Sequence, residues 1–173
     1  MSYPLVCLGD VADFINGVAF KPEDWGTEGK PIIRIQNLND PSKEYNYTKR
    51  EVKDTNIAHK GDLLVSWSAS LDVMIWNQGK GALNQHIFKV TSEQYPKSFY
   101  YFELLNYLKH FKMMAELRKT TMGHITQDHL KQAYICIPKI ELLEVMENKL
   151  KPIFDKNLIL HKENRQLAKL RDW

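Results

Sequence analysis

The stretch GDLLVSWSAS, residues 61–70, decides the fold because it alternates large apolar side chains with smaller polar ones. The Gly-Asp pair at its start is typical of a turn that leads into an extended segment. In such a segment alternate residues face opposite ways, with Leu63, Val65 and Trp67 on one face and Leu64, Ser66 and Ser68 on the other. The stretch therefore predicts a β-strand with an apolar face and a partly polar one.

Other strand patterns flank this segment. Residues 73–76 and 82–90 are rich in β-branched and aromatic side chains, and the Gly-Lys-Gly sequence at 79–81 predicts a turn between them. On the amino-terminal side, PIIRIQNLND at 31–40 predicts a further strand that ends in a turn. These patterns predict a compact, antiparallel-rich sheet between residues 32 and 90.

Helical patterns lie outside this region. Apolar residues at helical spacing predict a short opening helix over 8–15, which Gly17 would end. The aromatic-rich segment from 96 to 117 predicts a helix in two pieces, and its aromatic residues are interpreted as core. A short helix over 126–132 and a strand over 134–138 follow.

The carboxy-terminal segment from Ile140 to Arg171 lacks glycine and carries apolar residues every seven positions. That period is typical of a helix in a two-helix coiled coil, although the same stripe suits a helix lying on its own domain. Dense Lys and Glu around a narrow apolar seam favour a partner helix. Pro152 predicts a kink or break. The expected packing residues are Met146, Leu150, Ile153, Asn157, Leu160, Asn164 and Leu167.

Composition sets broad limits on this chain. Its 173 residues are 43% hydrophobic, enough for one mixed α+β domain over 1–138 followed by a helix over 139–173. The formal net charge of +3 permits a nucleic-acid partner without requiring one. Cys7 and Cys136 form no paired motif, and no apolar run reaches bilayer-spanning length. We therefore expect a cytoplasmic protein without a membrane segment.

The order of the motifs along the chain resembles one repeat of the specificity subunits of type I restriction-modification enzymes. The resemblance covers essentially the whole chain and ends in the long charged helix. The motifs are LGDVADFINGVAF at 8–20, PIIRIQNLND at 31–40, GDLLVSWSAS at 61–70, LNQHIFKV at 83–90 and HITQDHLKQAYICIP at 124–138.

This resemblance implies an amino-terminal target recognition domain that reads half of a bipartite double-stranded DNA sequence, with a spacer helix that sets the distance to the other half. It implies a modification (methyltransferase) subunit and a restriction subunit as partners. S-adenosylmethionine would belong to the methyltransferase, and no cofactor to this chain. Since one repeat is present, we expect a natural half-length subunit or, as we favour, a piece of a longer one. Either would associate with a second repeat or with itself through the helix.

Candidate DNA contacts are polar residues at strand ends and in loops, because Arg and Lys suit guanine, Asn and Gln suit adenine, and cations and hydroxyls suit phosphates. Each is also interpretable as an ordinary solvated residue, and His86 as a core histidine. The candidates are Lys21, Arg34, Gln36, Asn37, Ser66, Ser68, Ser70, Gln85, Arg118, Lys119, Thr120, Thr121 and His124.

The sequence does not favour an enzyme of its own. Asn39-Asp40-Pro41-Ser42 lacks the second proline and the aromatic residue of an adenine methyltransferase motif, and His124 and His129 are not spaced as zinc ligands on one helix face. We predict no catalytic, cofactor-binding or metal-binding residues. The alternatives left open are a protein-assembly module and a dimeric DNA-binding regulator that uses the helix for association.

Overall fold

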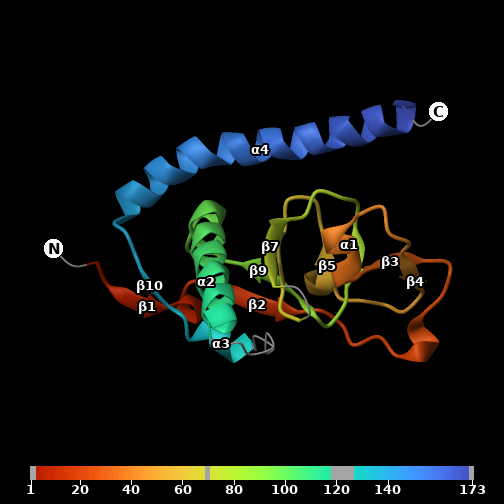
Figure 1. Cartoon of the computed structure of the whole chain (residues 1–173), viewed down its shortest axis with the longest axis horizontal. Helices are drawn as coiled ribbons and strands as arrows, with labels where there is room; N and C mark the ends of the chain where they lie inside the picture. Colours follow the sequence, from red (N-terminus) through yellow and green to blue (C-terminus); the bar gives the residue numbers. More distant parts are fainter. Residues whose placement is uncertain (1–2, 69–70, 118–126, 172–173) are drawn as a thin grey trace.

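The chain folds as a mixed α+β domain with one long carboxy-terminal helix lying across one side of it (Figure 1). The computed structural model describes residues 3–68, 71–117 and 127–171. Within these ranges no helix is long and apolar enough to cross a membrane. The elements are β1 (Leu5–Cys7), η1 (Leu8–Asp10), β2 (Asp13–Asn16), η2 (Pro22–Asp24), β3 (Lys30–Ile33), α1 (Ile35–Asn39), β4 (Asn46–Thr48), η3 (Asp54–Asn56), β5 (Ile57–Ala58), β6 (Leu63–Ser66), β7 (Asp72–Ile75), β8 (Gly81–Leu83), β9 (Ile87–Thr91), α2 (Lys97–Leu117), α3 (Gln127–Lys131), β10 (Tyr134–Cys136) and α4 (Ile140–Arg171).

The first sheet has the strand order β2-β9-β6-β7 and is antiparallel throughout. Every residue of β6 is buried because both faces of the strand are covered. Leu63 and Val65 belong to the larger hydrophobic core, which includes residues of α2. Leu64 belongs to a smaller core together with Ile33 and Leu83. The strand predicted within residues 61–70 is confirmed over Leu63–Ser66, where the face predicted to be partly polar is buried as well.

The second sheet has the order β4-β3-β8-β5 and differs from the single antiparallel group that we predicted. Strands β3 and β8 run parallel, with Ile33 opposite Leu83. Parallel pairing requires a long crossover, which residues 34–80 supply. The two strands approach so closely that a Cβ atom on Gly81 would lie 2.8 Å from the side chain of Ile33. Glycine at this position therefore permits the pairing that joins distant parts of the chain.

The helix predicted over residues 8–15 is wrong. One turn of 3-10 helix, η1, is followed by β2, in which Phe14 lies opposite Val90 of β9. The backbone N–H groups of Val11 and Ala12 both donate to the carbonyl oxygen of Leu8 and close that single turn. Pairing with β9 thus outweighs the helical spacing of the apolar residues.

The strand predicted over residues 31–40 ends at Ile33, and α1 follows. Asn37 causes this change of direction. Its Oδ1 atom accepts a hydrogen bond of 3.1 Å from the backbone N–H of Arg34, and its Nδ2 atom donates to the carbonyl oxygens of Lys43 and Glu44. Arg34 and Gln36 therefore do not share a strand face as predicted.

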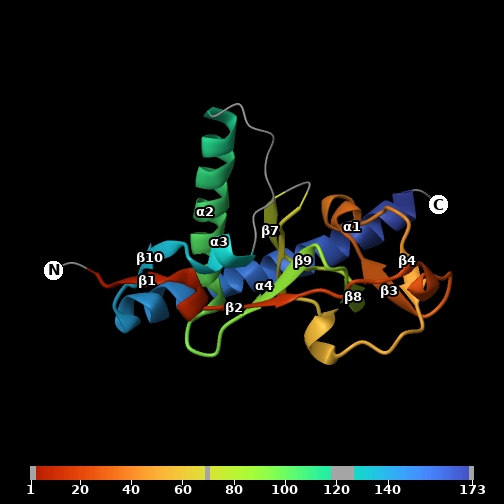
Figure 2. The same ribbon diagram turned by 90° about the horizontal axis from the view of Figure 1, so that it is seen from below.

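The remaining main elements are the helices α2 and α4 and the strands β1 and β10. This helix is continuous from Lys97 to Leu117, so the predicted division into two pieces is wrong. Strand β1 pairs with β10 and brings the amino-terminal segment beside the start of α4. Helices α2 and α4 cross at a steep angle (Figure 2), and Phe154 packs against Tyr101 at a ring-centroid distance of 5.4 Å.

Helix α4 runs as one helix from Ile140 to Arg171, so the break that we considered at Pro152 does not occur. The loss of one backbone hydrogen bond at proline is tolerated here. The predicted stripe divides between two environments. Met146 and Leu150 are half-buried against the domain, whereas Ile153, Leu160 and Leu167 are 60%, 45% and 62% exposed.

The domain holds α4 through a carboxylate at the start of α2. Ser98, which is fully buried in the first turn of α2, donates from Oγ to Oε2 of Glu147 at 2.5 Å. Negative charge is favourable at a helix amino terminus, where backbone N–H groups lack helical partners. The charge of Glu147 also acts on Tyr100 in the same turn of α2. Burial, and secondarily the negative charges of Glu147 and Asp62, raise the pKa of the Tyr100 hydroxyl to about 12. Glu147 is thus an anchor between α4 and the domain.

A buried lysine ties the two sheets together. Lys89 of β9 is 9% exposed, and its Nζ atom lies 2.8 Å from Oδ2 of Asp62 and 3.0 Å from the carbonyl oxygen of Ile57 in β5. The same Asp62 oxygen accepts the backbone N–H of His59 at 2.8 Å. A buried charge needs such partners, so Lys89 fixes β5 and its sheet against β9.

We predict that Lys89→Met lowers the free energy of unfolding by about 1–3 kcal/mol, because it leaves Asp62 and the Ile57 carbonyl without their shared donor. Urea denaturation followed by circular dichroism measures this change. Lys80→Met, at an exposed position, is the control and is expected to change stability by no more than about 0.5 kcal/mol. Equal stability of the two variants would contradict the assignment of Lys89.

Candidate nucleic-acid interface

Several chain segments meet at the turn between β8 and β9, residues 84–86, which we call the junction turn. The backbone N–H of Asn84 donates to the carbonyl of Ile33 at 3.0 Å, so the end of β3 lies beside the turn. The N–H of Gln85 donates to the carbonyl of Val18 at 2.9 Å, which adds the loop after β2. The backbones of three distant parts of the sequence therefore meet at one place.

Trp67, which follows β6, supports the junction turn from the first sheet. Its backbone N–H donates to the carbonyl of His86 at 3.3 Å, and its indole N–H donates to the carbonyl of Gln85 at 3.2 Å. Its ring lies 5.2 Å from the ring of His86 and is stacked 5.8 Å from that of Phe88. These contacts hold the turn in one conformation.

Arg34 lies directly after β3, with its side chain held from two directions. The guanidinium carbon lies 5.3 Å from the ring centroid of Trp25, and Nη1 donates to Oδ1 of Asn46 at 3.1 Å. Trp25 in turn packs edge-on against Phe20 at 6.1 Å. Because a guanidinium has five N–H donors, this arrangement orients the group and leaves donors for a ligand such as the O6 and N7 atoms of guanine.

The structure places the other predicted residues of this region unevenly. Lys21 is exposed, and its ammonium lies 4.0 Å from Glu23 in a solvent-screened pair, which leaves the cation accessible to a phosphate. Gln36 is also exposed and donates to the carbonyl of Glu44 at 3.3 Å. Ser68, the residue after Trp67, is half-buried.

Two predicted contact residues lie in the interior instead. Asn37 is fully buried, and its amide is used by the cap of α1 described above. Ser66 is 1% exposed, and its Oγ atom accepts the backbone N–H of Asp72 at 3.0 Å. Because these polar groups stabilise the fold and are covered by it, we exclude both residues from the candidate interface.

A second group of predicted residues lies outside the described part of the chain. It follows the end of α2 at Leu117 and precedes the start of α3 at Gln127, except for one serine between β6 and β7. The residues concerned are Ser70, Arg118, Lys119, Thr120, Thr121 and His124.

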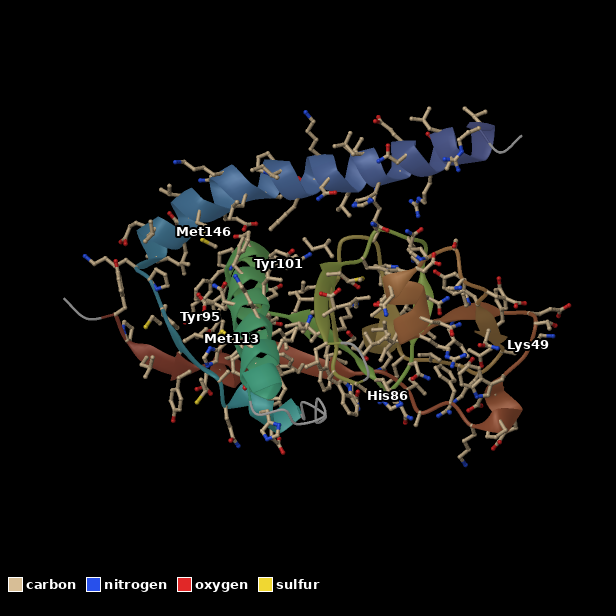
Figure 3. All side chains as sticks on the ribbon, viewed as in Figure 1. Lys49, His86, Tyr95, Tyr101, Met113 and Met146 are labelled. Atoms are coloured by element: carbon tan, nitrogen blue, oxygen red, sulfur yellow. The ribbon has the colours of Figure 1, made fainter. Side chains whose placement is uncertain are left out.

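The sequence interpretation missed Trp67 and His86 as parts of the site, because alternation assigned Trp67 to an apolar face and His86 to the core. Both are half-buried, and His86 lies on the side of the domain away from α4 (Figure 3). One signal was available: both residues lie at the ends of strands, where a polar or aromatic side chain leaves the sheet.

On the opposite side, α4 borders a groove of about 840 Å³ against β7 and the segment around α1. Asn157 and Asn164, predicted as packing residues, line this groove together with Arg165. The remaining exposed seam residues, Ile153, Leu160 and Leu167, do not line the groove. The junction turn and the exposed helix seam therefore occupy different sides of the molecule.

Comparison with known proteins gives a consistent result. The profile of the family described as the type I restriction modification DNA specificity domain matches residues 3–169. The specificity subunit of the type I restriction enzyme EcoBI from Escherichia coli is 25% identical over 153 residues, which cover 86% of this chain and 32% of that protein.

Solved structures show the same fold. The S subunit of a type I system from M. genitalium superposes with a TM-score of 0.58 at 17% identity, covering 99% of this chain and 44% of that one. The HsdS subunit from Thermoanaerobacter tengcongensis gives 0.57 at 20% identity, covering 94% and 40%. A chain from a study of complex assembly in the type I system gives 0.60 at 20% identity, covering 98% and 42%.

The chain thus spans about a third to less than half of the length of these relatives. The family match, in contrast, extends over nearly all of the chain, from the segment before β1 to the last turn of α4. On this basis the protein belongs to the family of type I restriction-modification DNA specificity domains.

Proposed function

We propose that this chain reads one half of a bipartite duplex DNA target through the junction turn and the side chains around it. The observation that carries this proposal is the convergence of Arg34 and Gln85 at the ends of the parallel strands β3 and β8. Both residue types form paired hydrogen bonds to base edges in the major groove, Arg with guanine and Gln with adenine. Lys21 would contact a phosphate and set the position of the domain on the duplex.

The rigidity of the site supports a role in reading sequence. Specific recognition requires donors and acceptors that are already oriented before the base arrives. Trp25 and Asn46 orient Arg34, and Trp67 orients the junction turn, through contacts that need no ligand. Flexible side chains on an open loop would supply positive charge without comparable discrimination.

We further infer that methyl transfer and DNA cleavage belong to partner subunits in the cytoplasm, a modification subunit that binds S-adenosylmethionine and a restriction subunit. The names of the relatives, which are subunits of type I restriction enzymes and systems, support this division of labour. This chain would then contribute recognition and carry no catalytic group or cofactor.

Helix α4 would act as the spacer that joins this domain to a second recognition domain. Ile153, Leu160 and Leu167 recur every seven residues and remain exposed, which is the seam that a second helix covers in a coiled coil. In a longer chain the second repeat would supply that helix. For the chain alone we propose an antiparallel pair of α4 helices from two copies.

We expect that the chain, mixed with its modification partner and a pool of random duplex DNA, enriches a short motif when the bound DNA is sequenced. Arg34→Ala should reduce the preference for guanine at one position of the motif by about tenfold, because a bidentate contact contributes about 1–3 kcal/mol of discrimination. Gln36→Ala tests the neighbouring exposed amide in the same way.

Arg165→Ala is the matched control, because Arg165 is also half-buried but belongs to α4, which lies on the side of the domain away from His86 and the junction turn. Its enriched motif should equal that of the unmodified chain. Binding without enrichment, or association with the partner that ignores DNA, would reject sequence reading and favour the assembly-module or regulator alternatives.

Multi-angle light scattering over a range of concentrations should show dimers of the chain alone. Leu160→Glu should shift the dimer toward monomer, because it places a charge in the proposed seam. Ile159→Glu is the control, since Ile159 is similarly exposed, 54% against 45%, but points to a different side of α4. A strict monomer at high concentration, or equal effects of both substitutions, would contradict the seam.

A further inference from the structure

Gln85 and His86 contact each other at the tip of the junction turn. The Nε2 atom of Gln85 lies 3.3 Å from the Nε2 atom of His86. A contact between an amide nitrogen and a ring nitrogen is a hydrogen bond only if the amide donates and the ring accepts. The ring proton of a neutral His86 is then on the other nitrogen, Nδ1.

That Nδ1 atom is buried and has no hydrogen-bond partner among the described residues. Histidines that stabilise a protein interior have their buried nitrogens paired, since an unpaired buried donor opposes folding. His86 is therefore poorly explained as a structural residue of the core. An unsatisfied polar group of this kind calls for a role in function.

The surroundings fix the orientation of the His86 ring. It packs on Trp67, which stacks on the buried ring of Phe88. The backbone carbonyl of His86 accepts a hydrogen bond from the N–H of Trp67. The imidazole is consequently a fixed acceptor, against which the carboxamide of Gln85 is oriented.

The carboxamide retains further hydrogen-bonding capacity. When Gln85 donates one Nε2 proton to His86, its second Nε2 proton and its Oε1 oxygen remain, and neither has a hydrogen-bond partner among the described residues. A donor and an acceptor side by side match the N7 and N6 groups of adenine in the major groove. A carboxamide without this anchor could rotate by half a turn and exchange the positions of its donor and its acceptor.

We propose that His86 is a positioning residue for base recognition, holding the Gln85 carboxamide in the orientation that reads adenine. This inference rests on the proposed DNA-reading function and assigns a base to one position of the target. Adenine would donate from N6 to Oε1 of Gln85 and accept at N7 from the second Nε2 proton. The first Nε2 proton would remain hydrogen-bonded to the ring nitrogen Nε2 of His86.

Two substitutions of His86 separate positioning from packing. His86→Phe retains an aromatic ring against Trp67 and removes both nitrogens, whereas His86→Gln retains a group that can accept from Gln85. The chain with its modification partner is presented with random duplex DNA, and the bound fraction is sequenced. Thermal unfolding of each variant is measured in parallel.

We expect the unmodified chain to enrich adenine at one position, and Gln85→Ala to lose that preference. His86→Phe should reduce the adenine preference by about fivefold at the same position only, and His86→Gln should restore most of it. The unfolding temperature of His86→Phe should equal or exceed that of the unmodified chain, because the unpaired buried nitrogen is gone.

The possible failures are distinguishable. If the unmodified chain enriches no motif, the proposed function fails and this inference fails with it. If a motif is enriched but His86→Phe leaves it unchanged, or lowers affinity for all sequences together with the unfolding temperature, DNA reading stands and the positioning role is rejected. Enrichment of a base other than adenine at the Gln85-dependent position would overturn the assignment of the base.

Discussion

The parallel pairing of β3 with β8 is the constraint on which the rest of the structure depends. It places the residue after Ile33 beside the residue after Leu83, although they are separated by the whole crossover. Because β8 belongs to one sheet and β9 to the other, the short junction turn links the two sheets. Lys89 reinforces the same link from within, through Asp62 and the carbonyl of Ile57. A change in this register would move Arg34 and Gln85 apart.

This framework separates the tasks of the domain in space. Recognition groups lie at strand ends, held by Trp25, Asn46 and Trp67, while α4 runs along another side and keeps its seam exposed. Glu147 and the Phe154 contact with Tyr101 join the helix to α2, so the arm has a defined direction relative to the reading surface. A helix used as a spacer requires such a fixed direction.

The sequence predicted those elements whose periodicity is strong and local. The strands β6, β7 and β9 and the helix α4 followed from alternation and from the seven-residue repeat. Parallel pairing was not predictable, because it depends on contacts between residues 32–33 and 82–83. The cap formed by Asn37 and the pairing of β2 overrode local patterns.

The candidate site shows the same division. Arg34 and Gln85 were found from residue type and position near strand ends, and the structure brings them to one place. Asn37 and Ser66 are also polar and lie near strand ends, but they are buried. Exposure and hydrogen-bond partners depend on the tertiary fold, so polarity alone could not distinguish these two pairs.

Hydroxyl-radical footprinting of the chain with its modification partner, with and without an enriched DNA duplex, tests the central claim that the junction turn faces the DNA. Mass spectrometry would follow the oxidation of Trp25, Trp67 and Tyr134, the last being 69% exposed on β10 away from the turn. The account predicts slower oxidation of Trp25 and Trp67 in the presence of DNA and an unchanged rate at Tyr134. DNA-dependent protection of Tyr134 with no protection of either tryptophan would contradict it.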